Sequence, residues 1–246
     1  MMNKARAALA VASLLASHVY AVELNDEFVL DATFSVLSQY RTRGISQTQN
    51  DPAMQFDGML SSKTTGLYLG TWTSNVDYGG GSNVRQELDY YAGWYVPFTQ
   101  DINMDLGYIK YTYKRGNEAN FSETYGILTA YGFKVAAQYS ENALSFDKGQ
   151  STMYTWVGYE TDIPYGLKLN ARYGKMDFKD PVFFSADGTT RQLYHEWEVK
   201  LSRLYSGLNW AVSYVDTDLS KQECYNTIGF GDACTAALVA SVSKKF

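Results

Sequence analysis

The sequence has few charged residues, few prolines and only two cysteines. Asp, Glu, Lys and Arg make up 19% of the 246 residues, compared with roughly 25% in soluble domains. The net charge of -5 is weakly acidic, which argues against a nucleic-acid-binding protein, because such proteins carry a clustered basic face. Aromatic residues reach 15% and include 21 Tyr, and this abundance argues against intrinsic disorder.

The chain also lacks long apolar runs. Lys4 and Arg6 precede the uncharged residues 7–16, a run about half as long as the ~20 residues of a membrane-spanning helix. A basic start, a short apolar run and a permissive site after Ala21 are typical of a secretory signal peptide, and an N-terminal membrane anchor is the less favoured alternative. We therefore predict a signal peptide at residues 1–21 and an exported protein at residues 22–246.

Most of the remaining chain alternates apolar and polar residues with period two, which is typical of strands with one apolar face. In residues 85–96, for example, Leu88, Tyr90 and Trp94 alternate with Glu87 and Asp89. Twelve such segments begin near residues 28, 53, 66, 85, 102, 122, 133, 151, 167, 194, 208 and 235. Their length of about eleven residues suits transmembrane strands, which need roughly 9–11 residues.

The connectors between these segments alternate between long and short without exception. Outer-membrane barrels have short periplasmic turns and longer outer loops, whereas soluble sandwiches have no reason to sort their loops in this way. We therefore predict an all-β fold, a transmembrane antiparallel up-and-down β-barrel of about twelve strands. Phe246 ends an alternating strand, which resembles the C-terminal insertion signal of bacterial outer-membrane barrels.

Aromatic residues gather at the predicted strand ends, where membrane barrels carry interfacial girdles. Those beside the short connectors are Tyr95, Phe98, Phe133, Tyr165 and Tyr205. Those beside the long connectors are Tyr40, Tyr78, Tyr111, Tyr113, Phe178 and Tyr194. We expect both groups to face lipid at the two membrane interfaces.

Two stretches carry a family resemblance. Residues 40–47 read Tyr-Arg-Thr-Arg-Gly-Ile-Ser-Gln, followed by Asp-Pro-Ala-Met-Gln at 51–55, and residues 66–77 read Gly-Leu-Tyr-Leu-Gly-Thr-Trp-Thr-Ser-Asn-Val-Asp. Together they resemble the TorF family of porins from Gram-negative bacteria. The resemblance implies an outer-membrane barrel with a pore, and it brings no established substrate and no assigned site residues.

Catalytic and metal-binding patterns are scarce. After removal of the signal peptide the only histidine is His195, and a Ser-His-Asp triad would have to be built on it. His195 shares its face with Trp197 and Val199, so we expect it to point towards lipid headgroups. Residues 101–105 mimic the start of a calcium loop, but Leu106 replaces the required Gly. We therefore expect no enzyme, no cofactor and no metal site.

Cys224 and Cys234 lie in the longest predicted loop. An exported protein meets an oxidising compartment, so we predict a disulfide between them, with two free thiols as the alternative. Such a bridge would stiffen the loop.

Charged residues of the alternating segments should face the lumen, because a lipid-facing Arg or Lys at the midplane costs about 2–4 kcal/mol. Both signs are present, with acidic residues in slight excess. The lumen-lining candidates are Asp31, Arg41, Asp57, Arg85, Glu87, Asp89, Asp105, Lys168, Arg172, Glu196, Glu198 and Lys200. These residues could line water, or they could pair across a narrow lumen and close it.

The pattern favours an outer-membrane channel for passive diffusion of small hydrophilic solutes. The alternative is a closed barrel that acts through its outer loops as an adhesin or envelope-structural protein. A membrane-embedded hydrolase is disfavoured by the single histidine. Expected partners are outer-membrane lipid, lipopolysaccharide, the barrel-assembly machinery and the solutes, with no nucleic acid.

Overall fold

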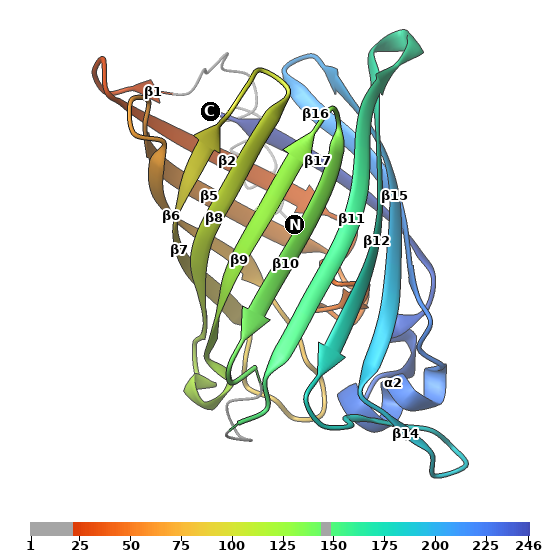
Figure 1. Cartoon of the computed structure of the whole chain (residues 1–246). Coiled ribbons are helices and arrows are strands. Elements are labelled where there is room, and N and C mark those ends of the chain that lie inside the picture. Colours follow the sequence, from red (N-terminus) through yellow and green to blue (C-terminus); the bar gives the residue numbers. More distant parts are fainter. Residues whose placement is uncertain (1–21, 144–148) are drawn as a thin grey trace, which may run out of the picture.

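The computed structural model describes residues 22–143 and 149–246, so the predicted signal peptide lies outside the described residues. Twelve long strands form the wall of a barrel (Figure 1). They are β2 Phe28–Leu37, β5 Ala53–Ser62, β6 Leu67–Asn75, β7 Gln86–Pro97, β8 Ile102–Tyr113, β9 Phe121–Ala130, β10 Phe133–Ser140, β11 Thr152–Ile163, β12 Leu167–Phe178, β15 Leu193–Tyr205, β16 Leu208–Thr217 and β17 Ala237–Lys245. The short strand β1, Val22–Glu23, adds to the end of β2.

The barrel is closed because β2 pairs with both β17 and β5. Lys245 lies opposite Thr33 on one side of β2, and Phe28 lies opposite Ser62 on the other. All neighbouring strands are antiparallel and follow each other along the chain, so the barrel wall has no open edge. The predicted all-β, twelve-stranded antiparallel up-and-down barrel is confirmed.

Long and short connectors lie at opposite ends of the barrel. The short connectors have two to four residues and the long ones seven to nineteen. Both two-residue turns pair a residue at positive φ with a glycine at positive φ, at Tyr131-Gly132 and at Ser206-Gly207. This geometry is that of a type I′ hairpin turn, whose twist matches the twist of the flanking strands. In Figure 1 the short turns are at the top and the long loops at the bottom.

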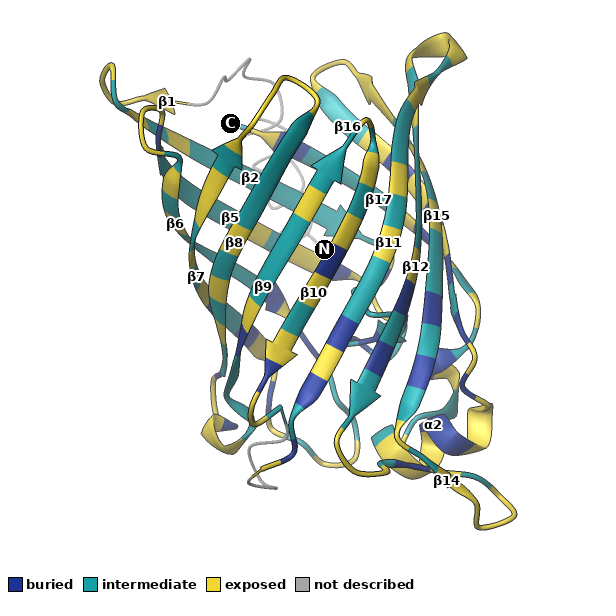
Figure 2. Ribbon diagram, viewed as in Figure 1, coloured by how far each residue is buried: buried dark blue, intermediate teal, exposed yellow. Residues whose placement is uncertain are grey.

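The strand alternation places apolar side chains on the outer wall. Along β7, Tyr90 is 52% exposed and Trp94 is 48% exposed, whereas Glu87 and Asp89, which precede them, are buried. Exposed and less exposed residues alternate in the same way along most strands (Figure 2). Among the described residues, no helix is both long enough and apolar enough to span a bilayer.

The two predicted aromatic girdles have different outcomes. Beside the short turns, Phe133 and Tyr205 are exposed on the outside. Tyr95 instead lies opposite the inward-facing Asp105 and lines the lumen, so the prediction that it faces lipid is wrong. At the long-loop end, however, Tyr113 and Tyr194 are buried, and Tyr40 and Tyr111 line an internal cavity. Tyr78 and Phe178 pack against buried clusters. The prediction that this group faces lipid is therefore wrong. The reason is register, because Tyr113 lies opposite the inward-facing Glu87 and therefore points to the same side of the sheet.

The longest loop, predicted from the sequence only as a connector, carries a folded cap. It contains α2, Lys221–Ile228, and a 3₁₀ turn at Gly231–Cys234. Ser220 and Glu223 form a capping box at the start of α2, and this Ser-x-x-Glu spacing was a readable signal for the helix. The predicted disulfide is confirmed, since Cys224 and Cys234 are bonded with a Cα–Cα distance of 6.0 Å.

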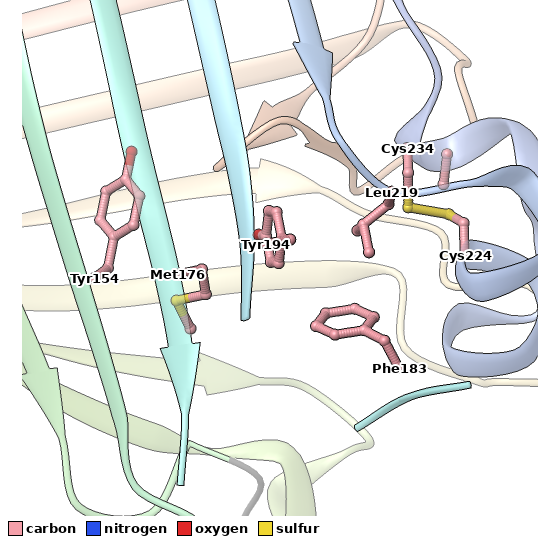
Figure 3. Close-up of a cluster of buried hydrophobic side chains, with 8 residues drawn as sticks. Tyr154, Met176, Phe183, Tyr194, Leu219, Cys224 and Cys234 are labelled. Atoms are coloured by element: carbon pink, nitrogen blue, oxygen red, sulfur yellow. A yellow bond between two sulfur atoms is a disulfide. The ribbon is translucent and has the colours of Figure 1, made fainter. Parts of the chain in front are cut away.

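The cap packs onto the long-loop end of the barrel. Both cysteines and Leu219 lie in one buried cluster with Phe183, Tyr194 and Met176 (Figure 3). Phe183 belongs to a small hairpin, β13 Phe183–Phe184 and β14 Thr190–Arg191, in the preceding long loop. The disulfide therefore fixes a plug of apolar side chains against the inner side of β12 and β15.

Candidate functional site

The first long loop folds into the barrel as a short hairpin. Its strands are β3, Arg41–Thr42, and β4, Ile45–Ser46, joined by Arg43 and Gly44. Both turn residues have positive φ, 49° for Arg43 and 82° for Gly44, which is the backbone of a type I′ turn. Because β3 and β4 are only two residues long, this turn presents the Arg43 side chain at the tip.

Arg43 binds the inner wall of the barrel. Its guanidinium donates to the Glu123 carboxylate at 2.6 Å and to the Gln138 side-chain oxygen at 2.7 Å. The same group lies 4.7 Å from the ring centroid of Tyr154, and the Tyr194 hydroxyl donates to the Arg43 carbonyl. Contacts from β9, β10, β11 and β15 therefore hold the hairpin tip inside the lumen.

Gly44 allows the hairpin to lie close to the opposite part of the wall. A Cβ atom at Gly44 would lie 2.4 Å from Cγ2 of Thr217 and 3.0 Å from Cβ of Glu196. Arg41 supports the hairpin from its base, since its guanidinium donates to the carbonyls of Gly44 and Thr235 at 2.8 Å. The hairpin thus narrows the lumen at its long-loop end.

The inner wall is divided by charge. Strands β2 and β5–β9 contribute six inward carboxylates, and their only Lys or Arg, Lys110, is exposed and paired opposite the outward-facing Tyr90. The carboxylates of this acidic half-wall are Asp31, Asp57, Glu87, Asp89, Asp105 and Glu123. The remaining strands carry five inward cations, Lys134, Lys168, Arg172, Lys200 and Lys245. A charge asymmetry of this kind produces a transverse field across the lumen.

Cations of the second half of the wall are mostly paired with acids beside them. Arg172 lies 3.0 Å from Glu196 and 3.2 Å from Glu198, and Lys168 lies 3.0 Å from Glu160. Only Lys245 reaches the acidic half-wall, where it lies 2.7 Å from Asp31. This half of the lumen is therefore nearly neutral.

Cations contact two carboxylates of the acidic half-wall, since Arg43 binds Glu123 and Lys245 binds Asp31. Tyrosine hydroxyls accompany several of these carboxylates. Tyr91 donates to Asp57 at 2.8 Å, and Tyr111 donates to Glu123 at 2.9 Å. Tyr68 donates to Asp105. A hydroxyl partner leaves the negative charge in place, so this wall keeps a net attraction for cations.

Ten of the twelve predicted lumen residues lie on the inner faces of barrel strands, and two do not. Arg41 is in the inserted hairpin. Arg85 precedes β7, and its guanidinium donates to the carbonyls of Ser82 and Val84 in the long loop. The structure thus places Arg85 at the end of the long loop, just before the strand β7 that holds Glu87 and Asp89.

Sequence reasoning missed the residues that form the constriction. Arg43 lies within the family-like stretch at residues 40–47, but no periodic pattern identifies a loop that folds inward. Glu123 was missed because Phe121, Tyr125 and Ile127 give the inner face of β9 an apolar character. That masks the alternation on which the other assignments depended.

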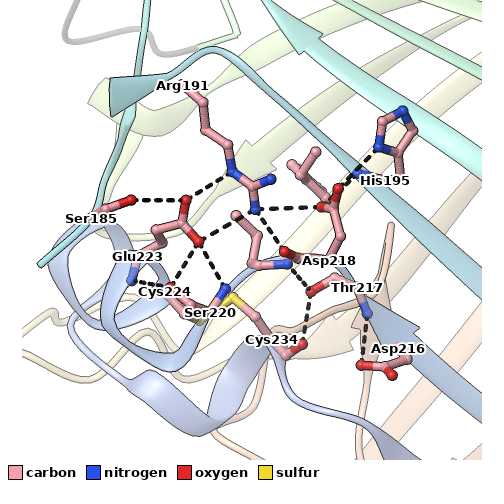
Figure 4. Close-up of polar contacts among 12 residues, drawn as sticks. Ser185, Arg191, His195, Asp216, Thr217, Asp218, Ser220, Glu223, Cys224 and Cys234 are labelled. Carbon is pink, nitrogen blue, oxygen red and sulfur yellow. Dashed lines mark hydrogen bonds and ion pairs between the residues drawn. A yellow bond between two sulfur atoms is a disulfide. The ribbon is translucent and has the colours of Figure 1, made fainter. Parts of the chain in front are cut away.

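A second polar cluster lies outside the lumen, in the cap (Figure 4). Arg191 lies 2.8 Å from Glu223 and 3.4 Å from Asp218, and Nδ1 of His195 lies 3.0 Å from Asp218. Burial favours a raised pKa for Glu223, but hydrogen bonds from Ser220 and the charge of Arg191 hold the pKa below its usual value of 4.5. These contacts tie the cap to β14 and β15.

Comparison with known proteins gives one family and one type of fold. The family model described as "Bacterial protein of unknown function (Gcw_chp)" matches residues 22–246. None of the curated proteins matches the chain in sequence. The solved NanC porin is 11% identical with a TM-score of 0.56 over 87% of this chain and 97% of its own. The KdgM porin is 10% identical with a TM-score of 0.53 over 88% and 99%.

Proposed function

We propose that this chain, which belongs to the Gcw_chp family, is an outer-membrane channel for passive diffusion of small hydrophilic solutes. The observation that carries the proposal is the combination of an apolar outer wall with a charged lumen in a closed barrel. Charged side chains line the interior of a wide barrel when water fills it. The fold shared with two solved porins and the likeness of residues 40–77 to TorF-family porins support the same proposal.

The lumen contains open space below the inserted hairpin. A cavity of about 390 Å³ includes Tyr40 and Thr42 of the first loop in its lining. A second cavity of about 690 Å³ extends towards the short-turn end. Tyr91, Asp105 and Tyr125 line both cavities, so the two adjoin each other, and we infer that a solute would pass from one to the other. The hairpin would then determine the size limit of the pore.

The proposed orientation follows the loop lengths. The short turns would face the periplasm, and the loops with the disulfide cap would face outwards, in contact with lipopolysaccharide. Outer-membrane lipid would surround the exposed apolar wall, and the barrel-assembly machinery would insert the chain. The predicted signal peptide at residues 1–21 fits this route.

Single-channel recording in planar bilayers tests the proposal. Purified, folded protein is expected to give stable conductance steps in potassium chloride. A heat-unfolded sample from the same preparation provides the control for detergent artefacts. A folded barrel that never conducts would contradict the channel function.

A second candidate is a closed barrel that acts through its outer loops as an adhesin or envelope-structural protein. The contacts of Arg43 with Glu123 and Gln138 favour it, because they hold the hairpin inside the lumen. The alternative would be supported if the folded protein gives no conductance in bilayers and still gives none after the hairpin contacts are removed.

A further inference from the structure

The cavity beneath the hairpin has an unusual lining. Three carboxylates, those of Asp57, Asp89 and Asp105, line its 390 Å³, and no lysine or arginine does. Aromatic side chains supply much of the remaining surface. The nearest cation of the hairpin, Arg43, is engaged by Glu123 and Gln138 and is absent from the lining.

Among these three carboxylates, Asp89 is the one with a buried oxygen that no described residue satisfies. Its side chain belongs to a residue that is only 3% exposed, and its Oδ1 atom makes no hydrogen bond within residues 22–143 and 149–246. A buried carboxylate oxygen without a donor is costly. Since Asp89 lines the cavity, a cationic donor inside that cavity would satisfy it.

The strand register places a tryptophan between two of these carboxylates. Asp57 lies opposite Trp72, and Trp72 in turn lies opposite Asp89. All three side chains point inwards from adjacent strands that are about 4.7–4.9 Å apart. An occupant of the cavity can therefore contact the indole ring while one carboxylate lies on either side of it.

Tyr40 adds a second aromatic surface from the loop side. Its ring centroid lies 5.3 Å from that of Trp72, and the two rings are inclined by 59°. Inclined aromatic rings close to carboxylates are typical of sites that bind organic ammonium groups, because the ring faces attract the cation. Such a cation is too large for a metal site.

We propose that this cavity binds a small organic ammonium ion, with its cationic group over Trp72 and between Asp57 and Asp89. A linear diamine fits best, since it presents one ammonium group to each carboxylate. A metal ion fits less well, because no group of three or more His, Cys, Asp or Glu among the described residues is arranged to hold one. The inference deepens the proposed channel function, on which it rests for access from water.

Calorimetric titration of the folded protein in detergent micelles with 1,4-diaminobutane tests the inference. Wild type is expected to bind the diamine, and Asp89→Asn is expected to weaken binding by about tenfold or more, because it removes a buried carboxylate that can accept from the ammonium group. Trp72→Leu is expected to weaken binding as well, by loss of the ring face. Asp162→Asn is the matched control, because this carboxylate is highly exposed at the short-turn end and lies outside the cavity.

The outcomes separate the inference from the channel function. A protein that conducts in bilayers but gives no binding heat with the diamine overturns the inference and leaves the channel intact. A barrel that binds the diamine but never conducts contradicts the channel function and supports the binding site. Calcium chloride alone is the competing probe, and binding of calcium with no binding of diamine would also overturn the inference. Should Asp89→Asn fail to fold, Asp57→Asn takes its place.

Discussion

The guanidinium of Arg43 lies 2.6 Å from the carboxylate of Glu123, although 80 residues separate them in the chain. Arg43 comes from a loop and Glu123 from the barrel wall, so this ion pair joins an insertion to the wall of the lumen. Both side chains are largely withdrawn from solvent. Breaking a buried pair by removing one partner is costly, because the remaining charge is left uncompensated.

Replacement of Arg43 is expected to widen the pore. Arg43→Ala removes the contacts with Glu123 and Gln138 that hold the hairpin tip, so single-channel conductance should increase. Arg85→Ala is the matched control, because Arg85 is an exposed arginine of another long loop. Equal conductance for wild type and Arg43→Ala would show that the hairpin does not limit ion flow.

Neutralising part of the acidic half-wall is expected to change ion preference. The Glu87→Gln, Asp89→Asn double variant removes two of six inward carboxylates, so the channel should shift towards anions. Reversal potentials in a salt gradient measure this shift, which should shrink at high salt as the screening length falls to about 3 Å at 1 M. An equal shift of the reversal potential in Asp162→Asn would argue against a specific role of the acidic half-wall in ion preference.

Acidification is expected to loosen the cap through Glu223. The folded-state pKa of Glu223 lies below the usual 4.5, so its carboxylate contributes stability that is fully present above about pH 4.5. That contribution is lost as the pH falls further, through the folded-state pKa. Hydrogen exchange of the α2 amides, corrected for the intrinsic pH dependence of exchange, should report faster opening of the cap at low pH.

The Glu223→Gln variant supplies the comparison. Its cap should open more readily than that of wild type at neutral pH, and its amide exchange should depend less on pH, because residue 223 then has no charge to lose. Glu118→Gln, at an exposed carboxylate in another long loop, should behave as wild type. Parallel pH profiles for wild type and Glu223→Gln would rule out this contribution.

Loss of the terminal aromatic ring is expected to reduce assembly. The backbone N–H of Phe246 donates to the Ala32 carbonyl at 2.7 Å, which extends the β17–β2 closure to the last residue. Phe246→Ala should lower the amount of heat-modifiable barrel in the outer membrane. Phe98→Ala, at an exposed short-turn aromatic, is the control, and equal amounts of folded barrel in both variants would contradict a role for Phe246 in insertion.

The period-two pattern and the loop lengths were enough to predict the barrel, its strand count and the faces of most strands. Period two assigns a side to each residue once a strand is recognised, so Glu87 and Asp89 could be assigned to one side of the wall and Tyr90 to the other. Loop lengths and turn residues identified the two ends. The pairing of Cys224 with Cys234 followed from the presence of only two cysteines in an exported chain.

The contents of the lumen, in contrast, follow from three-dimensional contacts that no local sequence pattern encodes. Whether a loop lies above the barrel or folds into it depends on contacts between distant residues, such as Arg43 with Glu123 and Gly44 with Thr217. The same holds for the row of Asp57, Trp72 and Asp89, because it depends on the register of three strands. A local pattern indicates which side a residue faces, whereas register and loop path determine which side chains it meets there.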